Sequence, residues 1–255
     1  MNDTAKERRD MSLKEKFSFP EASEPPWSLP SAALTVFAMF ICLTTIGPSF
    51  VAIAANSPIL SPAELMASWS LGMALSAVFV LVRSRASAEG WAALRMSRGE
   101  LALPLAPIIG VAIGLTIDLM ANLTFGRFLP PAQIWVLQSG GSLGLILAAL
   151  LLVVLQPLAE TLVFQAVLLP RLRWRLGHRF GLAATATVYT GLHYLIFFHT
   201  FVAYHLRWHG IALPLLLGIA FCLLKVFSQS SLVVLVARMG AGLIFLLTAL
   251  AVGGA

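Results

Sequence analysis

The stretch PLAETLVFQAVLLPRL, residues 157–172, decides how this chain is read. It is almost wholly apolar, yet it carries one carboxylate, Glu160, near its start. A charge at the centre of a membrane-spanning helix costs at least about 2.5–3.5 kcal/mol on insertion scales, so it persists where it is paired or useful. Glu160 precedes Arg171 by eleven residues, about 16 Å along a helix. Its partners must therefore come from other segments.

Composition places this stretch in a membrane protein. Of 255 residues, 59% are hydrophobic and 11% are charged, whereas a soluble domain has about 25% charged residues. This balance indicates a polytopic membrane protein in contact with the lipid bilayer. The net charge of +6 does not indicate a nucleic-acid partner, because the basic residues fall between apolar segments. The two cysteines, Cys42 and Cys222, lie in apolar runs and are interpreted as inert packing thiols.

Hydropathy divides the chain into a polar tail, residues 1–30, and a single membrane domain, residues 31–255. Apolar segments of about the length that a helix needs to cross a bilayer follow one another through this domain. They are Ala32–Ala55, Ala63–Val82, Leu101–Leu123, Ser142–Leu169, Phe180–Thr200, Ile211–Val226 and Leu232–Val252. The sequence therefore predicts an all-α helix bundle with about seven transmembrane helices, or eight.

Two local features qualify this assignment. The fourth segment is longer than the roughly 20 residues that a crossing requires, and Pro157 lacks the N–H that its helix position would use. We therefore expect a long helix that is tilted or bent near Pro157. The break between the last two segments, KVFSQSS at residues 225–231, is short and fits either a tight turn or a re-entrant bend.

Basic residues mark alternate loops. Those of the tail, of the loop after the second segment and of the loop after the fourth are Lys6, Arg8, Arg9, Lys14, Lys16, Arg83, Arg85, Arg95, Arg98, Arg171, Arg173, Arg175 and Arg179. The opposite loops carry only Arg127 and Arg207. Because cytoplasmic loops are enriched in Lys and Arg, the pattern predicts a multi-pass protein with a cytoplasmic N-terminus.

Ionisable groups inside the predicted segments are few. They are Glu64, Asp118, Glu160, His193, His199, Lys225 and Arg238. Glu64 and Asp118 lie near the outer ends of their segments, where we expect water to reach them, and Lys225 is near a segment end, where its side chain can snorkel. Glu160, His193 and Arg238 lie well inside.

These three inner residues allow two interpretations. A carboxylate beside a histidine can act as base and acid on water, or serve with it as a metal-ligand pair, with Arg238 as the group that stabilises an oxyanion. The alternative is a buried Glu160–Arg238 ion pair with His193 hydrogen-bonded nearby.

The opening stretch resembles the first motif of the CPBP family, the CAAX-processing and bacteriocin-processing intramembrane endopeptidases. That motif is a Glu-Glu pair followed by three residues and an Arg. YTGLH, Tyr189 to His193, is similar to the second motif, a Phe followed by three residues and a His. The surroundings of the third motif, a His with an Asn four residues later, are similar to FCLLKVFSQSSLVVLVARMGAGL. The resemblance covers most of residues 85–250 and implies a CPBP-like core there.

Of the polar residues in the three motifs, this chain keeps two and replaces four. Glu160 matches the first Glu, the family's proposed water-activating base, and His193 matches the second-motif His. Thr161 stands in place of the second Glu and Gln165 in place of the Arg. In the third motif, Arg238 stands where the His belongs and Gly242 where the Asn belongs.

These replacements weaken the implied chemistry. A glycine has no side chain to donate to an oxyanion, and losing one such donor costs about 10²–10³ in rate. Arg238 stays protonated, so it cannot act as base or metal ligand, and pairing with Glu160 would weaken that carboxylate as a base. We therefore expect a catalytically impaired pseudoenzyme that acts as a scaffold or accessory subunit, with other integral membrane proteins as partners.

Two other functions stay open. One is an active intramembrane endopeptidase that uses Glu160 and His193, with a divalent metal as a conceivable cofactor. The other is a haem- or pigment-binding subunit, because HYLIFFHTFVAYHLRWHG carries His193, His199, His205 and His209 and imidazole is a common axial ligand. His205 and His209 are four residues apart and would share a helix face.

Overall fold

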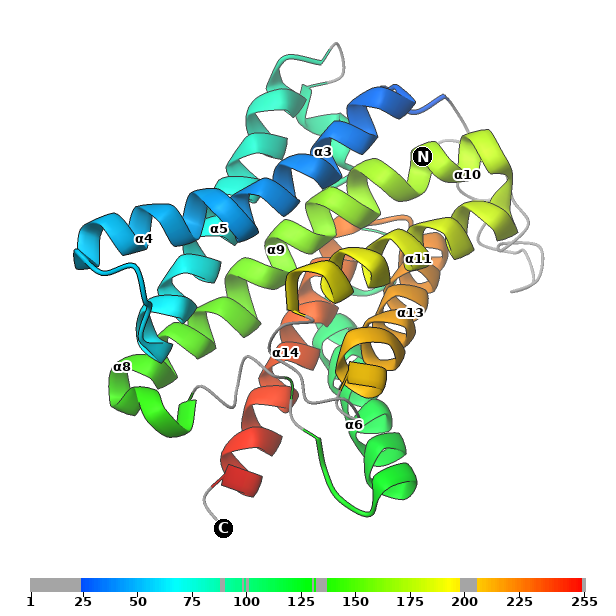
Figure 1. The fold of residues 1–255 in the computed structure, drawn as a ribbon. Helices are drawn as coiled ribbons and strands as arrows, with labels where there is room; N and C mark the ends of the chain where they lie inside the picture. The colour runs from blue at the N-terminus through cyan, green and yellow to red at the C-terminus, as the bar shows by residue number, and fades with distance from the viewer. Residues whose placement is uncertain are drawn as a thin grey trace.

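The computed structural model describes residues 24–87, 90–97, 99, 101–129, 131, 137–197 and 206–253. Within them the regular secondary structure is helical, which confirms the predicted all-α class (Figure 1). Much of the predicted tail, residues 1–23, lies outside the described residues.

The helices follow the order of the predicted segments. Those of the first half are α3 (Leu29–Ile41), η1 (Cys42–Ile46), α4 (Gly47–Ala55), α5 (Pro62–Arg85), η2 (Gly90–Leu94), η3 (Leu103–Leu105) and α6 (Ala106–Phe125). Those of the second half are α8 (Leu137–Ala149), η4 (Leu150–Leu155), α9 (Gln156–Glu160), η5 (Thr161–Leu168), α10 (Leu169–Leu176), α11 (His178–Phe197), η7 (Leu206–Ala212), α13 (Leu213–Ser228) and α14 (Ser231–Gly253).

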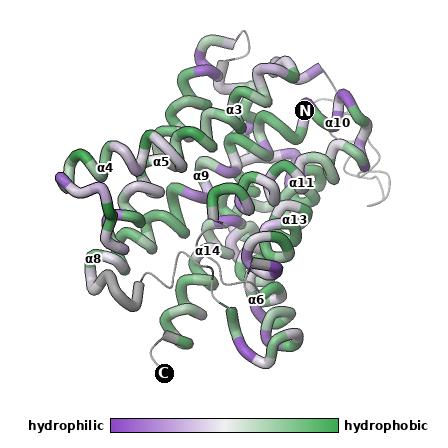
Figure 2. Tube along the Cα trace, viewed as in Figure 1, coloured by the Kyte–Doolittle hydropathy of each residue, from purple (hydrophilic) through white to green (hydrophobic). Residues whose placement is uncertain are grey.

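Among the described residues, six helical stretches are long and apolar enough to cross a membrane. They are Leu29–Ala55, Pro62–Arg85, Leu103–Phe125, Gly141–Leu176, Arg207–Ser228 and Ser231–Val252. The remaining predicted segment forms α11, which packs against α10 and α13. Hydrophobic residues predominate along the helices in Figure 2. The chain is therefore an integral, multi-pass membrane protein in contact with lipid.

The fourth predicted segment forms one long helical stretch, Gly141–Leu176, that runs through the bundle from α8 to α10 (Figure 1). It continues through Pro157, which occupies the first turn of α9. The turns just before α9, Leu150–Leu155, have π-helical hydrogen bonding, and so do the turns just after it, Thr161–Leu168. Because proline has no N–H, the carbonyl one turn earlier loses its helical hydrogen bond. Turns with π-helical hydrogen bonding occur as local interruptions inside α-helices.

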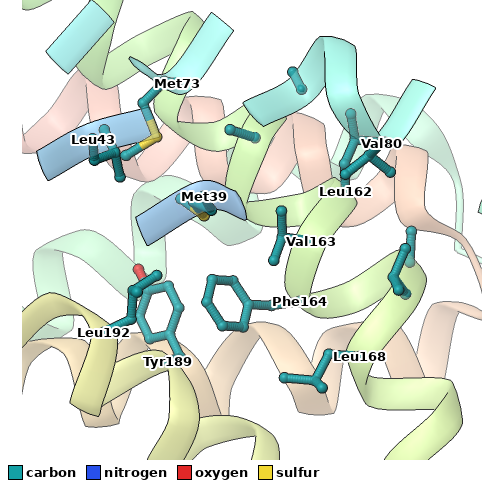
Figure 3. Packing of buried hydrophobic residues seen from close by; sticks show 14 of the residues in the cluster. Met39, Leu43, Met73, Val80, Leu162, Val163, Phe164, Leu168, Tyr189 and Leu192 are labelled. Carbon is teal, nitrogen blue, oxygen red and sulfur yellow. The ribbon is translucent and has the colours of Figure 1, made fainter. Parts of the chain in front are cut away.

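The stretch η5 forms the centre of the core. All eight of its residues are buried, and it packs against α3, α5, α10 and α11. Figure 3 shows Phe164 beside Tyr189, with Met39 and Leu168 nearby. The Phe164 and Tyr189 rings meet edge to face with centroids 4.9 Å apart, a geometry that aromatic pairs favour. This packing fixes α11 against the turn that follows Glu160.

The break between α13 and α14 is a tight turn. α13 ends at Ser228, and Gln229 has a left-handed backbone with φ of 55°. Ser231 donates its backbone N–H to the Arg95 carbonyl at 2.9 Å and its hydroxyl to the Leu94 carbonyl at 2.7 Å. The turn is thus held by the segment that follows α5.

Two expectations about water access are wrong. Lys225 does not snorkel to a boundary but is buried and donates from Nζ to Ser231 Oγ at 2.9 Å. Asp118 is also buried, in α6. Both residues lie near segment ends as predicted, but neighbouring elements cover them. Glu64 is different: it caps the start of α5, where its carboxylate accepts from the Ser61 N–H at 2.7 Å.

Helices α6 and α14 approach closely because glycines line their contact. A Cβ added at Gly110 would lie 1.7 Å from the Ala237 carbonyl oxygen, and one at Gly240 would lie 2.4 Å from the Pro107 carbonyl oxygen. Small residues let membrane helices approach closely enough for backbone contact. This contact fixes α14, the helix that carries Arg238.

We predict that Gly110→Ala destabilises the protein by about 1–3 kcal/mol, the usual cost of overpacking, since the helices must separate to admit the methyl group. The matched control is Gly144→Ala in α8, where an added Cβ meets nothing within 4 Å. Thermal unfolding in detergent measures both variants. Equal stability of the two would contradict this account of the contact.

Candidate functional site

Glu160 ends α9 and is buried, with a side chain that is 1% exposed. Its Oε1 accepts from Gln156 Nε2 at 2.7 Å and lies 3.1 Å from His193 Nε2. Its Oε2 accepts from the Tyr189 hydroxyl at 2.7 Å and forms an ion pair with Arg238 Nη1. A carboxylate offers about four lone-pair positions. When His193 carries its proton on Nε2, donors meet all of them and Glu160 is a saturated acceptor.

Helical spacing brings these donors to the carboxylate. Gln156 lies four residues before Glu160 on the same helical stretch, and Tyr189 lies four residues before His193 on α11. Side chains four residues apart share a helix face. Sequence reasoning did not single out Gln156, although its spacing from Glu160 is a recognisable signal for a hydrogen-bonded pair.

Arg238 comes from α14 and is 5% exposed. Its guanidinium carbon lies 4.4 Å from the Phe221 ring centroid and 5.1 Å from that of Tyr189. A guanidinium is weakly hydrated and stacks well on aromatic faces. Arg238 is therefore held both by rings and by the Glu160 carboxylate.

The two neutral replacements in the first motif differ in what they do. With its amide oriented to satisfy both neighbours, Gln165 donates to the Glu160 backbone carbonyl at 3.1 Å and accepts from Arg238 Nη2 at 3.2 Å. Thr161 is buried, and its hydroxyl has no hydrogen-bond partner among the described residues. Gln165 thus supports the ion pair, whereas Thr161 fills space beside it.

Gly242 has a packing role that the motif comparison did not reveal. A Cβ at this position would lie 2.1 Å from the Leu152 carbonyl oxygen. The helix α14 therefore approaches η4 too closely to accept a side chain there, and an Asn at residue 242 would require a backbone shift.

A pocket opens beside this cluster, with a cavity volume of about 70 Å³. Glu160, Tyr189, His193 and Arg238 lie at its wall together with His209 and Gly242. The other lining side chains are mainly apolar and include Leu152, Leu213, Leu217, Phe221 and Phe245. Ligand pockets in proteins commonly have this mixture of apolar walls with few polar groups.

Among the described residues, the cluster around Glu160 does not suit a metal ion. The described residues contain no group of three or more His, Cys, Asp or Glu side chains placed to hold one. Both oxygens of Glu160 already accept hydrogen bonds, and His193 Nε2 is directed at the same carboxylate. Zinc sites in enzymes require three protein ligands and an open position.

The histidine-rich run is only partly described. His209 is buried, lies at the pocket wall and has its Nε2 3.2 Å from the Leu129 carbonyl oxygen. His199 and His205 lie outside the described residues, and so does the predicted face shared by His205 and His209.

Comparison with known proteins supports the resemblance. Residues 142–244 match the family model described as type II CAAX prenyl endopeptidase, Rce1-like. This confirms the predicted likeness to the CPBP family over α8 to α14, a shorter region than the predicted 85–250. The chain matches no curated protein and no solved structure significantly.

We predict that Glu160→Leu and Arg238→Leu each destabilise the protein by about 3–5 kcal/mol, because each strands the other charge in the bundle. The double variant should be more stable than either single variant, since both charges are then removed. Thermal unfolding in detergent ranks the three proteins. Purely additive losses would contradict the ion pair.

Proposed function

We propose that this protein is a catalytically silent CPBP-like membrane protein that acts as a scaffold or accessory subunit of a membrane complex. The observation that carries this proposal is the saturation of the Glu160 carboxylate by Gln156, His193, Tyr189 and Arg238. A general base must hold a lone pair within hydrogen-bond reach of the water that it deprotonates. Glu160 has none to offer unless one of these donors leaves.

Arg238 keeps the Glu160 carboxylate ionised and occupied. A guanidinium keeps its proton in proteins, and this one is buried against two aromatic rings and paired with the carboxylate. A nearby cation stabilises the ionised carboxylate and so weakens it as a base. Activating Glu160 would require separating two opposite charges in a low-dielectric interior, which is costly.

The site also lacks a free side-chain donor that could stabilise an oxyanion. Gly242 supplies no donor side chain, and its contact with Leu152 leaves no room for one. Arg238 is the strongest donor nearby but is already engaged. The chain thus keeps a packed bundle and a pocket while its hydrolytic groups are occupied, which suits binding other integral membrane proteins better than cutting them.

An active endopeptidase is the second candidate, and one observation favours it. Glu160 and His193 line the same pocket and lie 3.1 Å apart. If Arg238 moved away, this pair would have the residue types needed to activate a water molecule.

We predict that the purified protein cleaves membrane peptides no faster than its Glu160→Gln variant. Gln at residue 160 keeps the size of the side chain but removes the carboxylate, so any cleavage that it abolishes would come from this site. The measurement is a digest of candidate transmembrane and prenylated peptides in detergent and in liposomes, followed by mass spectrometry. Cleavage by the wild type alone would contradict the proposal that the protein is catalytically silent.

Purification from native membranes in mild detergent tests the scaffold role with the same protein. We expect other integral membrane proteins to co-purify stoichiometrically. Recovery of this chain alone, under conditions that preserve other membrane complexes, would contradict the role.

We further propose that the N-terminus and the Arg-rich end of α10 face the cytoplasm. The support is the clustering of Arg171, Arg173, Arg175 and Arg179 against opposite loops with few basic residues. Trp174, in this end, has 45% of its surface exposed.

Cysteine labelling tests this orientation. In a variant without Cys42 and Cys222, Trp174→Cys should react with a membrane-impermeant thiol reagent only after the cytoplasmic side is opened. Ile59→Cys, in the exposed connection between α4 and α5, is the matched control and should react from outside. The reverse pattern would invert the topology.

A further inference from the structure

The place where α10 meets α11 is a rigid corner. α10 ends at Leu176 and α11 begins at His178, so Gly177 alone joins them. Gly177 has a φ of 81°, and its carbonyl accepts from the Gly181 N–H at 2.9 Å. A Cβ added at Gly181 would lie 2.5 Å from the Arg173 backbone nitrogen. The two helices therefore touch through their backbones, which holds the side chains of the corner in a fixed arrangement.

The surface of this corner mixes arginines with large apolar side chains. Hydrophilic residues gather there in Figure 2. Phe180 is 75% exposed and Leu176 is 47% exposed, and Trp174, Arg175 and Arg179 are exposed with them. We call these five residues the α10–α11 corner. Its two guanidinium groups thus stand among apolar side chains that the protein does not cover.

The position of the corner along the chain sets its depth in the membrane. It ends the membrane-spanning stretch Gly141–Leu176. Over residues 141–170 the sequence has Glu160 as its one ionisable residue, and Arg171 is the next. Basic residues and tryptophans are enriched where a membrane-spanning helix leaves the hydrocarbon. The corner therefore lies at the level of the lipid headgroups.

The lead-in to α3 covers one side of α10 but leaves this corner open. Arg171 Nη1 lies 2.7 Å from Glu24 Oε1, and the Arg171 side chain is 14% exposed. Arg173 is buried. Arg175 and Arg179 are exposed, so a group at headgroup depth can reach both of them.

The chemistry of these side chains suits a phospholipid. A guanidinium binds phosphate oxygens through paired N–H groups. Basic clusters beside a membrane-spanning helix attract anionic lipids. In a zwitterionic headgroup a cation accompanies the phosphate and offsets this attraction, whereas an anionic headgroup has no such cation.

We propose that the α10–α11 corner binds an anionic phospholipid, with its phosphate at Arg175 and Arg179 and its acyl chains against Leu176 and Phe180. An acidic protein surface would meet the arginines alone, whereas a lipid meets the arginines and the apolar side chains together. The corner residues do not line the pocket beside Glu160. This inference therefore goes beyond the proposed function, and each can fail without the other.

Quenching of Trp174 fluorescence by brominated lipids tests the proposal. The protein is placed in phosphatidylcholine vesicles that contain a small share of brominated phosphatidylglycerol or of brominated phosphatidylcholine with the same acyl chains. The protein has six tryptophans, so the signal of Trp174 is the difference between the wild type and Trp174→Phe.

We expect half of the maximal quenching at about a tenfold lower share of phosphatidylglycerol than of phosphatidylcholine, the effect of two arginines near an anionic headgroup. Equal quenching by the two lipids would overturn the proposal. Both leaflets of the vesicle contain the brominated lipid, so the result does not depend on the orientation of the protein.

Two double variants locate the binding, each compared with its own Trp174→Phe counterpart. Arg175→Gln with Arg179→Gln should abolish the preference for phosphatidylglycerol and leave quenching by phosphatidylcholine unchanged. The matched control, Arg127→Gln with Arg207→Gln, removes the same number of exposed arginines elsewhere and should keep the preference. A preference that survives in the first variant, or that disappears in both, would place the lipid elsewhere and refute the assignment.

Two further outcomes would identify a different partner. Glycerol 1-phosphate has the phosphate without the acyl chains, and it should not reduce the quenching by phosphatidylglycerol. If it does, the corner binds soluble phosphate compounds and the lipid assignment is wrong. The assignment is also wrong if the two lipids quench equally while an acidic protein co-purifies with the wild type and not with the Arg175→Gln, Arg179→Gln variant, because the corner is then a protein-binding surface.

Discussion

The pairing of Glu160 with Arg238 constrains the rest of this bundle, because two opposite charges must meet where lipid surrounds the helices. The carboxylate comes from the central stretch that ends α9, and the guanidinium comes from α14. Tyr189 and His193 on α11 donate to or contact the same carboxylate. Any motion that separates these helices would strand a charge, which is far costlier than losing an apolar contact.

The close packing of α14 serves this pairing. Glycines at residues 110 and 240 let α14 lie against α6, and Gly242 lets it lie against η4. Arg238 is thereby brought within reach of Glu160 and of Tyr189 on α11. The glycine at residue 242 that admits this approach has no side chain to donate to the pocket, so close packing and the absence of a donor at this position have one structural cause.

Much of this arrangement could be predicted from sequence, for identifiable reasons. Hydrophobic segment length predicts the helical class, and the resemblance to the CPBP motifs implies that Glu160, His193 and Arg238 lie together. Gln156 was missed because amides are common in helices, although its spacing from Glu160 is informative. The burial of Asp118 and Lys225 and the role of Gly242 depend on which helices cover them, and spacing along one chain does not determine this.

The most direct test of the account is a density map of the protein in lipid nanodiscs at a resolution that shows ordered water. The account predicts the Arg238 guanidinium against the Glu160 carboxylate, with Gln156, Tyr189 and His193 completing its contacts and no water bound to it. A water molecule on Glu160, with Arg238 turned toward lipid or the pocket mouth, would contradict the ion pair and favour a working hydrolytic centre.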